Sequence, residues 1–185
     1  MKNTIVVTSA GILAAISAVF QIVHLGYLSP WGMWIDLVAI PWILAYFLFG
    51  WRGALATSIV SAIIITLIAP STWLGALMKW VATFSMWFVP FLYQKFSKLS
   101  LSDFRRPKVI AISVIFALIL RGFLVIPLNY FYAIPIWTGM TPVQAIEFLP
   151  WWIIFGLNAV QGILEFSVAW MLIFRSKLER FCIWE

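Results

Sequence analysis

Five ionisable side chains lie inside stretches of this sequence that are otherwise apolar. Two are cations, Lys79 and Arg121, and three are carboxylates, Asp36, Glu147 and Glu165. Charged side chains in apolar spans are costly and usually pair with one another or face a bundle interior or a wet cavity. Their chemistry is therefore either internal ion pairing, of Lys79 or Arg121 with Asp36 or Glu147, or contact with a polar solute. Both interpretations stay open at this point.

Three amides accompany these charges. Asn129 occurs in PLNYFY, and Asn158 and Gln161 occur in GLNAVQG. Asn158, Gln161 and Glu165 are spaced i, i+3, i+7, which places them on one face of a helix. Asn129 also has a purely structural alternative, because its amide can bond a free backbone carbonyl close to a proline.

The composition predicts the elements that position these groups. The 185 residues are 64% hydrophobic, 18% aromatic and only 10% charged, whereas a soluble domain has about 25% charged residues. We therefore predict an all-α integral membrane protein with one transmembrane domain, residues 1–185, in the cell membrane. The net charge of +6 then reports topology, not nucleic-acid binding.

Six apolar segments are long enough, or nearly so, for a bilayer that needs about 20 residues per helix. They lie at roughly 4–24, 34–49, 53–69, 73–95, 108–129 and 147–174. The second and third are short, which predicts a tilted, broken or internal segment. Residues 142–149 are a candidate for a separate short helix, and an aromatic loop is expected at 130–141.

The basic residues divide by side when six spans are counted. One face receives Lys2, Arg52, Lys95, Lys98, Arg105, Arg106, Lys108, Arg175, Lys177 and Arg180. The opposite loops, 25–33, 70–72 and 130–141, contain no Lys or Arg. Cytoplasmic loops carry the excess of basic residues, so this pattern predicts a six-helix bundle with both termini cytoplasmic.

Depth along the helices predicts where the polar groups gather. At 1.5 Å per residue, Lys79 lies about 9–10 Å below the outer end of its helix and Arg121 about 20 Å above the inner end of its own. Asp36, Glu147 and Asn129 also belong to the outer half, whereas Glu165 belongs to the inner half. This predicts a pocket open to the outside for a polar, planar solute. Aromatic side chains available for stacking are Trp31, Trp34, Trp73, Tyr130, Tyr132 and Trp137.

Small residues recur every fourth position in the first helix, at Ala10, Ala14 and Ala18. Small residues at this spacing let a second helix approach closely within lipid. The stripe is expected either to pack inside the bundle or to dock a partner subunit.

The sequence lacks the common motifs for nucleotide binding, metal-dependent proteolysis and serine hydrolysis. A nucleotide-binding GxxxxGK[ST] loop, HExxH and GxSxG are absent. His24 and Cys182 are the single histidine and cysteine, so we expect no metal site and no internal disulfide. An intramembrane enzyme would need its acids to meet, yet Glu147 and Glu165 are about 27 Å apart along a helix. We therefore predict a binding protein without cofactors, not an enzyme.

Three stretches carry a resemblance to a known family. WIDLVAIPWILAYFLFGWRGALATSIV at 34–60, LNYFYAIPIW at 128–137 and LPWWIIFGLNAVQGIL at 149–164 resemble the substrate-binding S components of energy-coupling factor (ECF) transporters, and among them the riboflavin-binding branch. Their order and spacing cover most of the chain.

The resemblance implies a subunit that captures a vitamin from the extracellular side beneath a lid formed by the loop after the first helix. It also implies a transmembrane coupling protein, met here by Ala10, Ala14 and Ala18, and two ATPase subunits. Substrate-binding residues implied by the resemblance or by the polar pattern are Asn129, Asn158, Gln161, Lys79, Asp36, Arg121, Tyr130 and Trp34.

Two departures from the riboflavin branch leave the ligand open. Gln161 stands where that branch usually has Lys, and Gly75-Ala76-Leu77-Met78-Lys79 replaces a Gly-Glu-Leu-Ala-Asn stretch. We therefore expect riboflavin or a related micronutrient. The alternative is a different, anionic vitamin, which the two cations Lys79 and Arg121 would favour.

Overall fold

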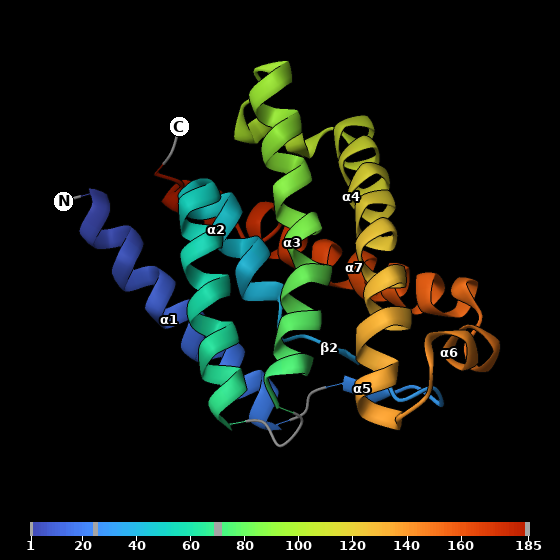
Figure 1. Ribbon diagram of the computed structural model, residues 1–185. Coiled ribbons are helices and arrows are strands. Elements are labelled where there is room, and N and C mark those ends of the chain that lie inside the picture. Colours follow the sequence, from blue (N-terminus) through green and yellow to red (C-terminus); the bar gives the residue numbers. More distant parts are fainter. Residues whose placement is uncertain (1, 24–25, 69–71, 184–185) are drawn as a thin grey trace.

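The computed structural model describes residues 2–23, 26–68 and 72–183, and it is mostly helical (Figure 1). His24 lies outside the described residues. The helices and strands are α1 (Lys2–Val23), β1 (Gly26–Leu28), β2 (Trp34–Asp36), α2 (Ile40–Ile68), α3 (Thr72–Ser97), η1 (Leu101–Arg105), α4 (Pro107–Leu128), η2 (Asn129–Ala133), α5 (Ile134–Thr138), α6 (Pro142–Phe148), α7 (Trp151–Phe174) and η3 (Leu178–Phe181).

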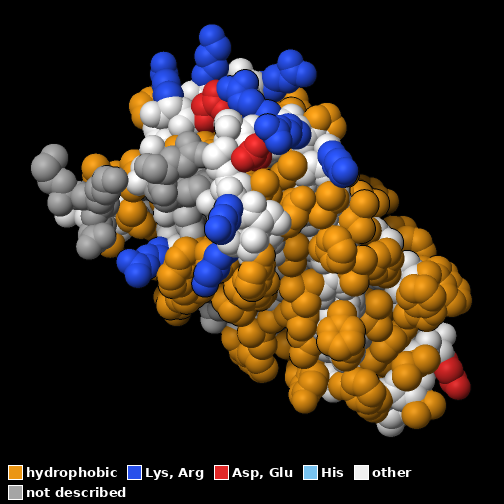
Figure 2. Space-filling view, turned by 90° about the horizontal axis from the view of Figure 1, so that it is seen from above, with side chains coloured by type: hydrophobic (Ala, Val, Ile, Leu, Met, Phe, Trp, Pro, Cys, Tyr) orange, Lys and Arg blue, Asp and Glu red, His pale blue; other side chains and the backbone are white. Residues whose placement is uncertain are grey.

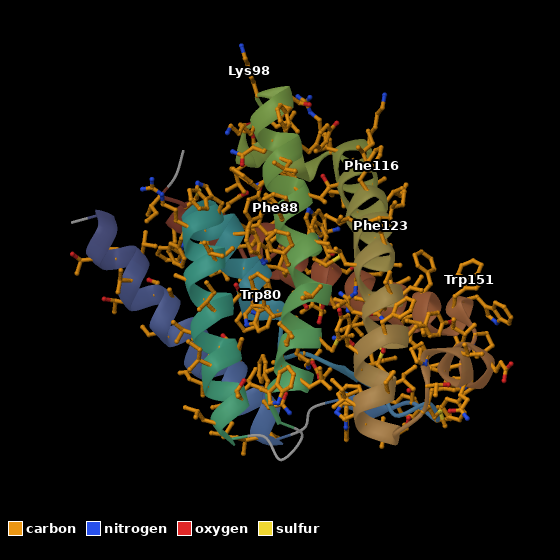
Figure 3. All side chains as sticks on the ribbon, in the orientation of Figure 1. Trp80, Phe88, Lys98, Phe116, Phe123 and Trp151 are labelled. Atoms are coloured by element: carbon orange, nitrogen blue, oxygen red, sulfur yellow. The ribbon has the colours of Figure 1, made fainter. Side chains whose placement is uncertain are left out.

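Five helical segments within the described residues are long and apolar enough to cross a membrane. They are Thr4–Val23, Ile40–Ile68, Trp73–Ser97, Pro107–Thr138 and Trp151–Phe174. Large apolar side chains on them face outward, as Phe116, Phe123 and Trp151 do in Figure 3. An outer surface of this kind suits a hydrocarbon environment and confirms the multi-pass membrane character.

Helix α2 is broken at Gly50. This residue has φ 72° and ψ −170°, a region that only glycine occupies readily. In Figure 1 the chain runs up to this point and then turns back down. The first part, residues 40–49, is only about 15 Å long, and every side chain from Ile40 to Phe47 is buried. The expected short segment is therefore an internal helix surrounded by the others.

The segment expected to be helical from residue 34 begins instead as a β-hairpin. Strand β2 pairs antiparallel with β1, with Gly26 opposite Asp36 and Leu28 opposite Trp34. A Cβ at Gly26 would collide with the carbonyl oxygen of Ile35, so the close pairing requires glycine. Helix α2 starts only at Ile40, because the extended hairpin uses the residues before it.

The polypeptide between α4 and α7 is helical where a loop was expected. After Pro127 the chain widens into a π-helical turn, Asn129–Ala133, and continues as α5. The side-chain amide of Asn129 donates to the Val125 carbonyl over 2.8 Å at the start of this turn. The expected last segment, 147–174, is divided into α6 and α7, and the separate short helix α6 confirms the prediction for 142–149.

Helix α7 does not lie parallel to its neighbours. In Figure 1 it crosses behind α3 and α4 at a steep angle. An aromatic cluster anchors its second half: Phe47 meets Phe104, Phe166 and Phe174 in edge-to-face geometry, with centroids 5.7–5.9 Å apart. Such contacts add to the apolar burial, and they fix the angle at which α7 crosses the bundle.

Basic residues collect at one end of the bundle. In Figure 1 the start of α1, the break at Gly50, the connection from α3 to α4 and the end of α7 lie toward the same end, and Figure 2 shows Lys and Arg side chains gathered over part of that face. The hairpin, α5 and α6 lie at the opposite end. The separation of basic residues that the sequence predicted is therefore present in space.

The small-residue stripe of α1 is covered. Ala10, Ala14 and Ala18 are buried, with 3%, 0% and 8% of their surface exposed, and α1 packs chiefly against α2. Ser17 strengthens this contact, since it donates to the Val38 carbonyl (2.8 Å) and accepts from the Trp42 indole N–H (3.0 Å). The stripe packs against α2 in this structure, which is the first of the two alternatives that the sequence left open.

Candidate functional site

The centre of the candidate site is a two-way contact between the side chain of Gln161 and the backbone of Asp36. The Asp36 N–H donates to Gln161 Oε1 over 3.0 Å, and Gln161 Nε2 donates to the Asp36 carbonyl over 2.9 Å. The carboxamide of α7 thereby pairs with β2 as a neighbouring strand would. Both atoms of the amide are used, so the contact fixes the hairpin at one place on α7.

Glu165 determines which way round the Gln161 amide lies. Gln161 Nε2 also donates to Glu165 Oε1 over 2.5 Å. A flipped amide would turn its oxygen toward a carboxylate and a carbonyl, and three acceptors would then face one another. One turn of α7 thus separates the amide from the carboxylate that orients it.

Arg121 holds Glu165 and Asn158 from the other side. Its Nη1 lies 3.1 Å from Glu165 Oε2, and its Nε donates to Asn158 Oδ1 over 3.2 Å. The side chains of Arg121 and Glu165 are only 3% and 1% exposed. A charge buried this deeply needs a partner of opposite sign and further hydrogen bonds, and this arrangement supplies both.

Lys79 completes the cluster from α3 by forming an ion pair with the carboxylate of Asp36. The other oxygen of that carboxylate accepts the Val38 N–H over 3.0 Å. The cluster consists of Asp36, Lys79, Arg121, Asn158, Gln161 and Glu165, and we call it the polar cluster. It draws its members from β2, α3, α4 and α7.

The charges within the polar cluster balance. Each cation faces a carboxylate, Lys79 with Asp36 and Arg121 with Glu165. The sequence suggested that Lys79 and Arg121 together would favour an anionic ligand. The pairing corrects the basis of that argument, since neither cation is left without a counter-ion. Arg121 pairs with Glu165 and not with either carboxylate that the sequence offered as its partner, Asp36 or Glu147.

The hairpin closes the polar cluster. Besides the Asp36 contacts, the Asn158 side-chain amide lies 3.7 Å from the Met33 sulfur, and its other bond goes to the Ile154 carbonyl of its own helix over 2.9 Å. Met33 comes from the turn between β1 and β2. A solute can therefore reach these amides from outside only if the hairpin moves.

Two residues predicted for the site, Asn129 and Tyr130, form their hydrogen bonds outside the polar cluster. Asn129 bonds the Val125 carbonyl, as its structural alternative predicted, although Val125 is not the carbonyl that Pro127 leaves free. The Tyr130 hydroxyl donates to the Leu149 carbonyl over 2.8 Å and ties η2 to the chain before α7. Trp34 is 39% exposed on β2.

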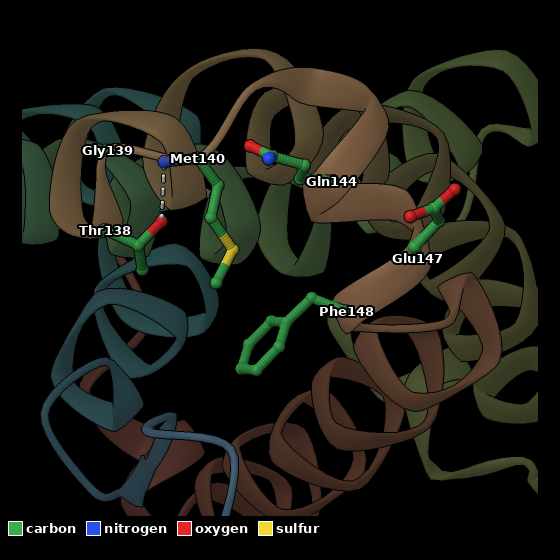
Figure 4. Close-up of a pocket in the computed structure, with 6 residues that line it drawn as sticks. All are labelled: Thr138, Gly139, Met140, Gln144, Glu147 and Phe148. Carbon is green, nitrogen blue, oxygen red and sulfur yellow. Dashed lines mark hydrogen bonds between the residues drawn. The ribbon is translucent and has the colours of Figure 1, made fainter.

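Two surface pockets lie elsewhere. One, of about 460 Å³, lies against α5 and α6, and its lining is Thr138, Gly139, Met140, Gln144, Glu147 and Phe148 (Figure 4). The Met140 and Phe148 side chains point toward one another across it, whereas the Glu147 carboxylate points away. The second, of about 320 Å³, lies between α2 and α3 and is mostly apolar. Neither pocket is lined by the polar cluster.

Sequence reasoning missed two participants and underrated a third. Met33 and the backbone of Asp36 carry no signal in residue type. Glu165 was recognised as a buried charge but placed too deep to join the others, although its spacing from Gln161 already put both on one face. In the part of the chain that the structure describes, no group of three or more His, Cys, Asp or Glu side chains is placed to hold a metal ion.

Comparison with known proteins gives the fold. No protein-family model matches the chain, and no curated protein matches it. A solved structure of the S component of a bacterial ECF transporter is similar, with a TM-score of 0.72 and 22% sequence identity, over 95% of this chain and 97% of that one. The chain therefore has the fold of an ECF-transporter S component.

Proposed function

We propose that this chain is the substrate-binding subunit of an ECF-type uptake transporter, which captures riboflavin or a related micronutrient from the extracellular side. The observation that carries the proposal is the polar cluster beneath the hairpin, in a fold similar to that of an S component. A stripe of amides inside an apolar bundle, closed by one movable element, suits capture of a polar solute.

The charge balance favours an uncharged ligand. Binding at Asn158 and Gln161 would replace hydrogen bonds with hydrogen bonds, and the buried ion pair of Arg121 with Glu165 would stay intact. An anionic vitamin would instead have to draw a cation away from its carboxylate, which leaves a buried charge without a partner. Riboflavin therefore remains the leading ligand.

The proposed topology follows from the position of the basic residues. The five apolar helical segments give six membrane passes if α2 is counted as two passes, residues 40–49 before Gly50 and the rest of the helix after it. The end of the bundle with Lys and Arg then faces the cytoplasm, and the hairpin faces outward. Under this proposal the protein lies in the cell membrane, with both termini inside.

The proposed coupling protein would meet a different face of α1. The surface opposite the buried alanines is exposed and contains Thr8, Gly11 and Ala15, and Gly11 has nothing within 4 Å of an added Cβ. Small residues on an exposed helix face permit close approach of another transmembrane helix. Together with two ATPase subunits, such a partner would supply the energy for transport.

Ligand retention tests the proposal directly. Native mass spectrometry of the detergent-purified protein should detect one retained small molecule per chain, and titration with riboflavin should quench flavin fluorescence at a 1:1 ratio. Asn158→Ala should lower riboflavin affinity by about tenfold or more, because the buried amide is lost. Asn129→Ala is the matched control, since that amide bonds only within its own helix region.

Two results would contradict the proposed function. Equal loss of affinity in the two variants would place the ligand away from the polar cluster. A wild-type protein that retains nothing and binds no riboflavin would rule out riboflavin capture. An intramembrane enzyme is disfavoured by geometry, since Glu165 is paired with Arg121 while the Glu147 carboxylate belongs to α6 and points away from the pocket beside it.

A further inference from the structure

The contact between Gln161 and Asp36 uses groups that resemble a ligand. The backbone N–H and C=O of Asp36 present a hydrogen-bond donor beside an acceptor. The Gln161 side chain pairs with them through its oxygen, 3.0 Å from the Asp36 nitrogen, and its nitrogen, 2.9 Å from the Asp36 oxygen. The same complementary pairing would hold a ring that carries N–H next to C=O. In this structure that edge is supplied by the protein itself.

We infer that the Asp36 peptide group is a built-in placeholder, which occupies the Gln161 amide until a neutral ligand with an adjacent N–H and C=O displaces it. This inference rests on the proposed function and adds the chemical class of the edge that is recognised. It also assigns Asp36 a role as competitor of the ligand.

Two separable parts hold the placeholder. One is the amide contact itself, and the other is the ion pair between the Asp36 carboxylate and Lys79. Lys79 is the less buried partner, with 19% of its side chain exposed against 7% for Asp36. Both charges can therefore return to water when the hairpin lifts, so the ion pair acts as a releasable latch.

Glu165 is the positioning residue of this device. By accepting from Gln161 Nε2 it keeps the donor and acceptor of the amide in a fixed order. Arg121 in turn fixes Glu165. The cluster thus selects an edge with one order of donor and acceptor, and an edge with two acceptors would meet the Gln161 oxygen unfavourably.

If the ion pair acts as a latch, its removal should raise the affinity for riboflavin. The double variant Asp36→Asn/Lys79→Met removes the ion pair without leaving a single charge and leaves Gln161 untouched. It should bind riboflavin about fivefold to tenfold more tightly than wild type, because a larger fraction of molecules has the amide available. If Asp36 and Lys79 were ordinary ligand contacts, the same variant would bind more weakly, and that result would overturn the inference.

The recognised edge is tested with a matched pair of probes. Riboflavin carries an imide N–H between carbonyls, and its 3-methyl derivative has a methyl group in place of that hydrogen, so it can neither donate a hydrogen bond there nor approach as closely. Wild type should bind the methylated flavin at least about tenfold more weakly. Equal affinity for both flavins would overturn the assigned edge.

Hydrogen exchange tests the placeholder without any ligand. In Gln161→Leu the Asp36 amide should exchange at least about tenfold faster than in wild type, because its acceptor is gone. Gln94→Leu is the control, because this amide accepts a bond from Tyr46 at the other end of the bundle. Unchanged protection of Asp36 in Gln161→Leu would overturn the inference. A wild type that binds no riboflavin, but shows this exchange pattern, would contradict the riboflavin assignment alone.

Discussion

The guanidinium of Arg121 lies 3.1 Å from the carboxylate of Glu165, and both side chains are almost fully buried between α4 and α7. Each compensates a charge that the apolar bundle would otherwise not tolerate. Because Glu165 also orients Gln161, this ion pair supports the polar cluster as well as the packing of two helices.

Removal of one partner should be far more harmful than removal of both. Arg121→Met or Glu165→Leu alone should lower the free energy of unfolding by about 3–5 kcal/mol, whereas Arg121→Met/Glu165→Leu should cost much less, since no buried charge remains. Unfolding in mixed detergent micelles measures all three. Additive effects of the two single changes would contradict direct pairing.

Ser17 should contribute measurably to the attachment of α1. Ser17→Ala removes the bond to Val38 and leaves the indole N–H of the fully buried Trp42 without its acceptor. The expected loss is about 1–3 kcal/mol. Thr8→Ala, on the exposed face of the same helix, should change stability by less than about 0.5 kcal/mol. Similar losses in both variants, measured by thermal unfolding, would argue against the role given to Ser17.

The break in α2 should depend on glycine. Gly50→Ala places a Cβ at φ 72° and ψ −170° and should destabilise the protein by about 1–3 kcal/mol. Gly156→Ala is the control, because nothing lies within 4 Å of the added Cβ and alanine is the better helix former. A Gly50→Ala protein as stable as wild type would show that the turn does not need this conformation.

The connection between α3 and α4 should weaken in acid. The backbone N–H and the side-chain hydroxyl of Ser100 bond the Asp103 carboxylate, and with nearby Arg106 they hold its pKa below the ordinary value. A lowered pKa in the folded state means that the contribution to stability is present above the unfolded pKa and is lost as pH falls through the folded pKa. In Ser100→Ala the pKa of Asp103 should rise, as carboxyl NMR titration would detect. A pKa that stays unchanged would assign the shift to other groups.

Much of the fold follows from the apolar runs and the basic residues between them. The sequence predicts the long apolar helices and the crowded basic end, because the length of an apolar run and the charge of a loop can be read directly from the residues. The count of six passes and the cytoplasmic termini stay predictions. The hairpin was missed because no glycine or proline separates WID, residues 34–36, from the apolar run that follows. Only its pairing with Gly26–Leu28 makes it a strand.

The sequence predicted most of the residues of the polar cluster, but it did not predict which of them pair with one another. Five of the eight predicted site residues come together in the structure: Asp36, Lys79, Arg121, Asn158 and Gln161. Asn129 and Tyr130, which the sequence placed with them, form their hydrogen bonds elsewhere. The sequence placed Glu165 too deep, because a depth of 1.5 Å per residue assumes upright helices, whereas α7 crosses the bundle at a steep angle. The same is true of the small-residue stripe at Ala10, Ala14 and Ala18. Its spacing predicts close contact with another helix but does not say which helix that is.

The sharp turn at Gly50 also bears on how the chain enters the bilayer during synthesis. Residues 40–49 are too short to cross the hydrocarbon layer unaided, yet they end up enclosed on all sides. They are therefore expected to be carried in as one arm of a helical hairpin with the longer arm that follows, and to lose contact with lipid only after α3, α4 and α7 have been released from the ribosome. Biogenesis of this protein thus ends with assembly of its centre.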